Sequence, residues 1–131
     1  MRLVLRFAGT FNLLAGAAMI SLYHEGYKLL EIPKPHLILP EQIMGVLVGL
    51  FGVGYHMVAS RPIVNRNILV LGFWSKAISS GFVFWYVAAG QLPLWSVAAV
   101  TLSDLIYLPP FYMIWRHLSR LARADTSPDA T

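Results

Sequence analysis

The segment ILVLGFWSKAISSGFVFWYVAA, residues 68–89, decides which kind of fold this chain can form. It is apolar along its whole length except for one lysine and a few serines near its middle. A run of about 20 apolar residues is long enough to cross the hydrocarbon core of a bilayer as an α-helix. We therefore predict a membrane-spanning helix here, and its lysine, Lys76, needs either a partner or a function.

Three further stretches have a similar character. We predict spanning helices at about residues 3–23, 42–59, 67–90 and 94–116. The 131 residues are 57% hydrophobic and 12% charged, whereas soluble domains are about 45–50% apolar and 25% charged. We expect an all-α, integral membrane four-helix bundle over residues 1–118, followed by a disordered cytoplasmic tail over residues 119–131. A cleaved signal peptide at the N-terminus and a re-entrant second segment are alternatives that the sequence leaves open.

Basic residues indicate how the helices are oriented. Arginines mark the predicted helix ends on one side of the membrane: Arg2, Arg6, Arg61, Arg66, Arg116, Arg120 and Arg123. The other side carries only Lys28 and Lys34, in a loop rich in prolines and acidic residues. Because cytoplasmic loops carry an excess of Lys and Arg, both termini are predicted to face the cytoplasm. The net charge of +4 then reflects orientation and contact with anionic headgroups, and we expect no nucleic-acid partner.

Lys76 and Asp104 are predicted to meet inside the membrane. Lys76 lies roughly ten residues beyond Arg66, which at about 1.5 Å per residue is about 15 Å deep, near the middle of the hydrocarbon core. Asp104 reaches a similar depth on the next predicted helix, after a short turn at Gly90. An unpaired charge at this depth costs about 2.5–3.5 kcal/mol, and pairing removes much of that cost. The expected ion pair is either purely structural or a site for a substrate, proton or cofactor.

Other polar residues share the helix faces of this pair. Serines follow the lysine at i+3 and i+4, and a threonine and a tyrosine flank the aspartate at i−3 and i+3, which places them on the same faces. With one polar residue from each of the first two helices, the expected polar centre consists of Lys76, Asp104, Asn12, His56, Ser79, Ser80, Thr101 and Tyr107. Alternatively, Asn12 provides only an interhelical hydrogen bond, and His56 lies at the membrane interface.

Small residues and prolines predict how the helices pack. Glycines recur at helical spacing in the first two predicted helices: Gly9, Gly16, Gly45, Gly49 and Gly52. Small residues let helices approach closely in lipid, so we assign these glycines to helix packing. In the fourth helix, Pro109 and Pro110 predict a kink, because each proline leaves a carbonyl one turn earlier without its helical donor.

The sequence lacks recognisable catalytic motifs. No glycine-rich phosphate loop, nucleophile elbow or pair of catalytic carboxylates is present, so we assign no catalytic residues and expect a non-enzymatic role. A membrane enzyme that uses the ion pair and Tyr107 as acid and base is the weakest alternative. The absence of cysteine excludes disulfides and thiolate metal ligands. The outer loop, residues 24–41, offers histidines and glutamates to a metal, but such loops are more often simply solvated, and we assign no metal site.

Three strings carry a resemblance to a known family: RFAGTFNLLAG at residues 6–16, FGVGYHM at 51–57 and SDLIYLPPF at 103–111. Together with the four-span architecture, they resemble the small four-helix bacterial membrane proteins of the DoxX-like kind. The resemblance implies a bacterial inner membrane and an association with redox or quinone-linked complexes. It identifies no functional residue.

Two functions therefore compete. The first is a non-enzymatic subunit or binding module of a membrane complex, in contact with lipid and with further copies or other subunits. The second is a small dimeric transporter or proton-coupled carrier that uses the Lys76–Asp104 pair. The sequence specifies no cofactor for either function.

Overall fold

The computed structural model describes residues 1–126, and within this range the chain is helical, without strands. Four helical segments are long and apolar enough to cross a membrane: Arg2–Ser21, Leu39–Ser60, Asn67–Ala88 and Trp95–Asp125. The expected all-α class and the four apolar helices are thereby confirmed. These features are those of a small multi-pass membrane protein.

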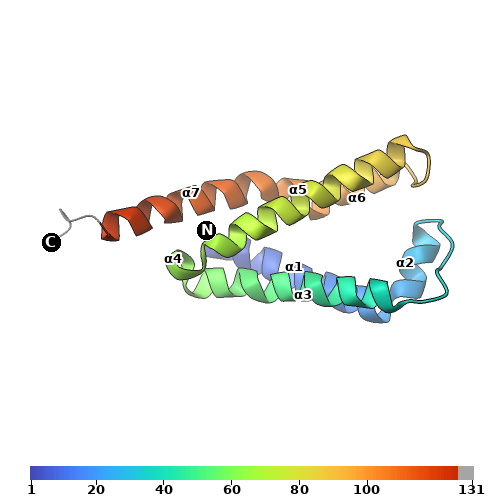
Figure 1. Cartoon of the computed structure of the whole chain (residues 1–131), viewed down its shortest axis with the longest axis horizontal. Helices are drawn as coiled ribbons and strands as arrows, with labels where there is room; N and C mark the ends of the chain where they lie inside the picture. Colours follow the sequence, from blue (N-terminus) through green and yellow to red (C-terminus); the bar gives the residue numbers. More distant parts are fainter. Residues whose placement is uncertain (127–131) are drawn as a thin grey trace.

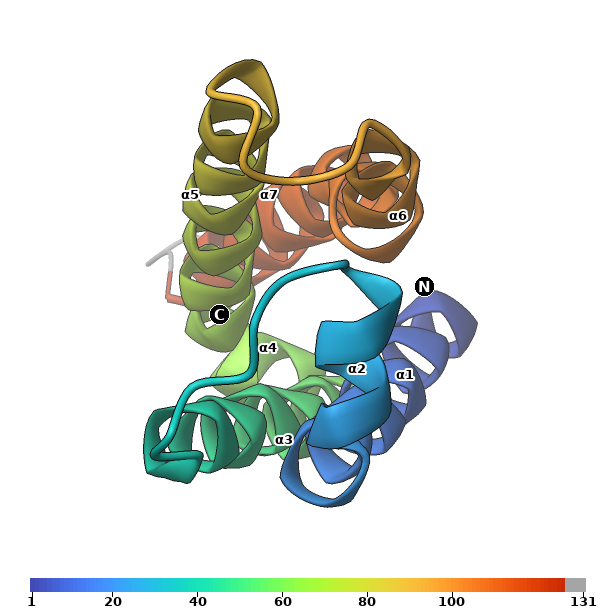
Figure 2. The same cartoon turned by 90° about the vertical axis from the view of Figure 1, so that its right-hand side faces the viewer.

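The helices form two antiparallel pairs (Figure 1). The N-terminal hairpin, residues 2–60, contains α1 (Arg2–Ser21), the short α2 (Tyr23–Leu29) and α3 (Leu39–Ser60). After α4 (Pro62–Asn65), the C-terminal hairpin, residues 67–125, contains α5 (Asn67–Ala88), α6 (Trp95–Ser103), the 3₁₀ turn η1 (Leu105–Tyr107) and α7 (Leu108–Asp125). The N-terminus, α4 and the end of α7 lie toward one end of the molecule (Figure 1). Figure 2 looks onto the other end, where α2 and the turn between α5 and α6 lie.

Glycines hold α1 against α3. A Cβ added at Gly16 would lie 2.5 Å from the carbonyl oxygen of Gly45 and 2.8 Å from the backbone nitrogen of Gly49. A Cβ at Gly52 would likewise lie 2.7 Å from the carbonyl oxygen of Gly9. These distances are too short for any side chain, so the predicted glycine stripes are the contact surface of this hairpin.

The two hairpins meet mainly near the end that holds α4. The ring of Tyr55 on α3 lies against Gly72 on α5, where a Cβ would clash with it. Tyr55 also packs on Phe111 of α7, with ring centroids 4.9 Å apart, and both side chains are fully buried. Toward the opposite end, α5 diverges from α3 (Figure 1). The buried core is therefore concentrated in one half of the molecule.

The fourth apolar segment is interrupted earlier than expected. Pro109 and Pro110 lie in the first turn of α7, where proline is tolerated because the backbone N–H has no helical acceptor. The helix instead breaks at Asp104, which ends α6 with φ −126° and ψ −55°. The helix is thus interrupted on the N-terminal side of the prolines, and Asp104 lies in the irregular segment.

Two further segments differ from the sequence-based expectation. Part of the outer loop forms α2. Helix α7 continues to Asp125, so residues 119–125 are helical where we expected a disordered tail. Leu118, which is 1% exposed, packs in the core and extends an amphipathic pattern that favours helix beyond the apolar segment. The remainder of the expected tail, residues 127–131, lies outside the described residues.

Candidate functional site

Lys76 and Asp104 form a buried ion pair. Lys76 Nζ lies 2.8 Å from Asp104 Oδ1, and the lysine and aspartate side chains are 7% and 22% exposed. The ammonium also donates a hydrogen bond of 3.2 Å to the carbonyl oxygen of Ser103, and it lies 5.2 Å from the centroid of the Tyr107 ring. Because an ammonium has three donors, one N–H remains available to a ligand.

The break in the helix creates this geometry. In a continuous helix, the backbone N–H of Tyr107 would donate to the carbonyl of Ser103. Here it donates to the carbonyl of Asp104 instead, at 3.1 Å. The Ser103 carbonyl is therefore released from the helix and accepts from Lys76. The Ser103 carbonyl and the carboxylate of the next residue, Asp104, thus bind the same ammonium.

A cavity of about 260 Å³ lies beside the pair and is lined by residues of both hairpins. Helices α1 and α3 contribute mainly apolar walls, including Phe11 and Phe51. The polar residues that line it are Asn12, Tyr55, Ser75, Lys76, Ser79, Ser103 and Asp104. Ser75 and Ser79 are exposed, so the cavity is open at this part of α5. The arrangement provides an accessible space with apolar walls and an ion pair at its edge.

Three of the predicted polar residues have local hydrogen bonds or packing roles. The Ser80 hydroxyl donates to the Lys76 carbonyl at 2.7 Å, and the Thr101 hydroxyl donates to the Val97 carbonyl at 2.7 Å. Neither residue lines the cavity. Tyr107 packs its ring beneath the lysine ammonium and against Phe111 at a centroid distance of 5.7 Å. Tyr107 therefore contacts the ammonium, whereas Ser80 and Thr101 bond only within their own helices, and none of the three lines the cavity.

Asn12 and His56 differ in their positions. Asn12 is 7% exposed, lines the cavity and donates to the Val48 carbonyl at 3.5 Å. His56 instead packs beside Gly9 on α1, with Nε2 3.3 Å from the Thr10 hydroxyl. The structure therefore brings Asn12 to the site and keeps His56 away from it.

Tyr55 is the residue that sequence reasoning missed. It lies one position before His56, and it lines the cavity from α3 while its ring fills the space left by Gly72. Its position one turn after Phe51 on a glycine-containing face was the available signal. That signal did not identify the partner, because the contact joins two different hairpins.

The outer loop is held by aromatic side chains. The Tyr27 hydroxyl donates to a carboxylate oxygen of Glu41 at 3.1 Å, and the Lys34 ammonium lies 5.3 Å from the Tyr23 ring centroid. Burial raises the pKa of Tyr27, and the charge and hydrogen bond of Glu41 raise it further. Within residues 1–126, no three histidine or acidic side chains are close enough to hold a metal ion.

Comparison with known proteins finds no match to this chain among family models, curated proteins or solved structures.

Proposed function

We propose that this chain is a small multi-pass protein of a bacterial inner membrane, with both termini cytoplasmic, that binds a small ligand in the Lys76 cavity. It acts as a non-enzymatic binding module or subunit of a larger membrane complex. The observation that carries the proposal is the open cavity at the Lys76–Asp104 pair. A pair needed only for packing would not require an accessible space beside it.

The chemistry of the cavity favours an uncharged ligand with a polar head and an apolar body. The pair is neutral as a whole, yet it retains one ammonium donor and one carboxylate oxygen for a ligand. The Asn12 amide adds donors and an acceptor, while Phe11 and Phe51 provide apolar walls. A quinone headgroup has this chemistry, and the DoxX-like resemblance of the sequence is the reason to test quinones first.

The orientation is supported by where the arginine-bearing segments lie. The N-terminus, α4 and the end of α7 share one end of the molecule (Figure 1), and these segments contain or adjoin the arginines. By the excess of Lys and Arg on cytoplasmic loops, that end faces the cytoplasm. A reporter enzyme that folds only in the cytoplasm should then be active when it is fused to either terminus, and a reporter that needs export should be inactive.

Native mass spectrometry after mild extraction tests the binding proposal. The unaltered protein is expected to retain a small molecule or a partner subunit. Ser79→Phe should remove the small molecule, because it places a ring in the cavity opening. Ile78→Phe is the matched control, since Ile78 is a neighbouring, exposed residue that does not line the cavity. Equal retention by both variants would contradict binding at this site.

A second function, a dimeric transporter or proton-coupled carrier, is favoured by the break at Asp104. Transporters bind substrates at discontinuous helices whose unwound carbonyls face the site, and the Ser103 carbonyl is such a group. Four spans are few for a pathway, so this function requires a second copy. Flux into proteoliposomes that is unaffected by the double change Lys76→Met and Asp104→Leu would exclude it.

A further inference from the structure

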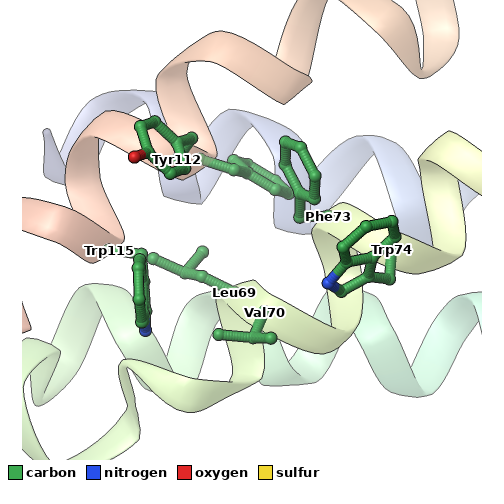
Figure 3. Close-up of a pocket in the computed structure, with 7 residues that line it drawn as sticks. Leu69, Val70, Phe73, Trp74, Tyr112 and Trp115 are labelled. Atoms are coloured by element: carbon green, nitrogen blue, oxygen red, sulfur yellow. The ribbon is translucent and has the colours of Figure 1, made fainter.

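A second cavity, of about 230 Å³, lies between α5 and α7 (Figure 3). Its labelled lining residues are Leu69, Val70, Phe73, Trp74, Tyr112 and Trp115. Leu69 is fully buried, whereas Trp74 and Tyr112 are 58% and 50% exposed. The cavity is thus an apolar recess with exposed aromatic side chains at its rim, and it is separate from the Lys76 cavity.

Arginines lie at one end of this apolar cavity. Arg66 precedes Leu69 and Val70 by three and four positions, and Arg116 follows Tyr112 by four positions. Arg116 lies in α7, where a spacing of four places it on the same helix face as Tyr112. Arg66 immediately precedes α5, about one turn from Leu69 and Val70. The Arg66 guanidinium donates one hydrogen bond of 2.6 Å, to the Ile63 carbonyl. Within residues 1–126 the only ion pair is that of Lys76, so neither guanidinium has a carboxylate partner there.

We infer that this cavity binds an anionic phospholipid, with one acyl chain between α5 and α7 and the phosphate at Arg66 and Arg116. The apolar lining matches an acyl chain, and arginine binds phosphate through two parallel hydrogen bonds. The end that holds α4 carries the arginines, so the chain would enter the recess from the interface where phosphates lie. The exposed Tyr112, four residues before Arg116, is an aromatic residue typical of that interface. Trp74 lies two residues from Lys76 and therefore deeper, beside the acyl chain.

Tryptophan fluorescence can test this inference directly. Trp74 and Trp115 line the cavity, whereas Trp85 and Trp95 lie near the turn of the C-terminal hairpin. In a Trp85→Phe, Trp95→Phe background, the emission comes from the cavity alone. Brominated phosphatidylglycerol is expected to quench it at a lower mole fraction than brominated phosphatidylcholine. Equal quenching by the two lipids would overturn the inference. This test needs no change at the cavity itself.

Charge variants locate the phosphate. The double change Arg66→Gln and Arg116→Gln should reduce the preference for the anionic lipid by about fivefold for each arginine. This factor corresponds to about 1 kcal/mol for each basic residue at a membrane surface. Arg2→Gln with Arg6→Gln is the matched control, because it removes the same charge from α1. An equal loss in both variants would show a general surface effect and overturn a specific site.

A cavity-filling variant identifies the occupant. Val70→Phe leaves both arginines in place, and it should reduce quenching by either lipid because an acyl chain no longer fits. Unchanged quenching would contradict the inference. If the cavity instead accommodates an apolar helix of a partner subunit, the purified protein should show no preference between the lipids.

Discussion

The two hairpins of this protein are packed in different ways. In the N-terminal hairpin, glycines bring the backbones of α1 and α3 into contact. In the C-terminal hairpin, large aromatic side chains separate α5 from α7 and leave a cavity of about 230 Å³. The buried side-chain polar atoms that lack partners within residues 1–126, Ser96 Oγ and Trp115 Nε1, both belong to the C-terminal hairpin. The comparison indicates that the N-terminal hairpin is close-packed along its length, whereas the C-terminal hairpin contains a cavity between its own helices and the buried polar atoms without partners.

The largest expected effect comes from the Lys76–Asp104 ion pair, whose two residues both belong to the C-terminal hairpin. Lys76→Met or Asp104→Leu alone should destabilise the protein by about 2.5–3.5 kcal/mol, because each change leaves one charge unpaired at depth. The double variant should lose less than either single variant. Unfolding in mixed micelles, followed by circular dichroism, measures all three. Additive losses would mean that the two side chains do not interact.

A somewhat smaller effect is expected from the contact of α1 with α3. Gly16→Ala should destabilise the N-terminal hairpin by about 1–3 kcal/mol, because the added methyl overlaps backbone atoms that cannot move away. Gly49→Ala is the control: a Cβ there meets nothing within 4 Å, and alanine favours helix by up to about 1 kcal/mol. The same unfolding measurement applies. Equal midpoints for the two variants would contradict the assignment of this hairpin as the close-packed one.

The contact between the hairpins should be more tolerant. Gly72→Ala pushes against the Tyr55 ring, which is a side chain and can shift, so we expect a loss of about 1 kcal/mol. Gly81→Ala, also in α5, meets open space and should cause no loss. Adding Tyr55→Phe to Gly72→Ala should restore part of the stability, since the hydroxyl is the atom that approaches the glycine most closely. No difference between the two alanine variants would argue against this contact.

Much of the fold follows from the sequence, because length, apolar composition and glycine spacing are local properties. The Lys76–Asp104 contact could also be predicted, since two deep charges on neighbouring helices are each too costly alone. Tyr55 and His56 show where such reasoning ends. They are adjacent in sequence but point about 100° apart around α3, and only the packing of the hairpins determines which one reaches the cavity. The helix break is a similar case. The prolines predict that the fourth segment is interrupted, but its exact position at Asp104 depends on the contact with Lys76.

The smallest expected effect concerns the loop that closes the N-terminal hairpin, where the Tyr27 hydroxyl donates to Glu41. The pKa of Tyr27 is raised by burial and by Glu41, so the folded protein holds this proton more tightly than the unfolded chain does. The resulting stability is present below the unfolded pKa of about 10 and is lost as the pH rises through the folded pKa. Tyr27→Phe should therefore cost less than about 1 kcal/mol at pH 7 and weaken the alkaline loss of stability. Unfolding midpoints between pH 7 and 11 measure both effects.

Tyr86→Phe, near the turn of the other hairpin, is the matched control, and an identical pH dependence in both variants would remove Tyr27 as the cause. A difference confined to Tyr27 would mean that a side-chain hydrogen bond to Glu41 secures the loop of the N-terminal hairpin, whereas the turn of the C-terminal hairpin is held by backbone hydrogen bonds from Gly90 and Gln91, which do not titrate in this range.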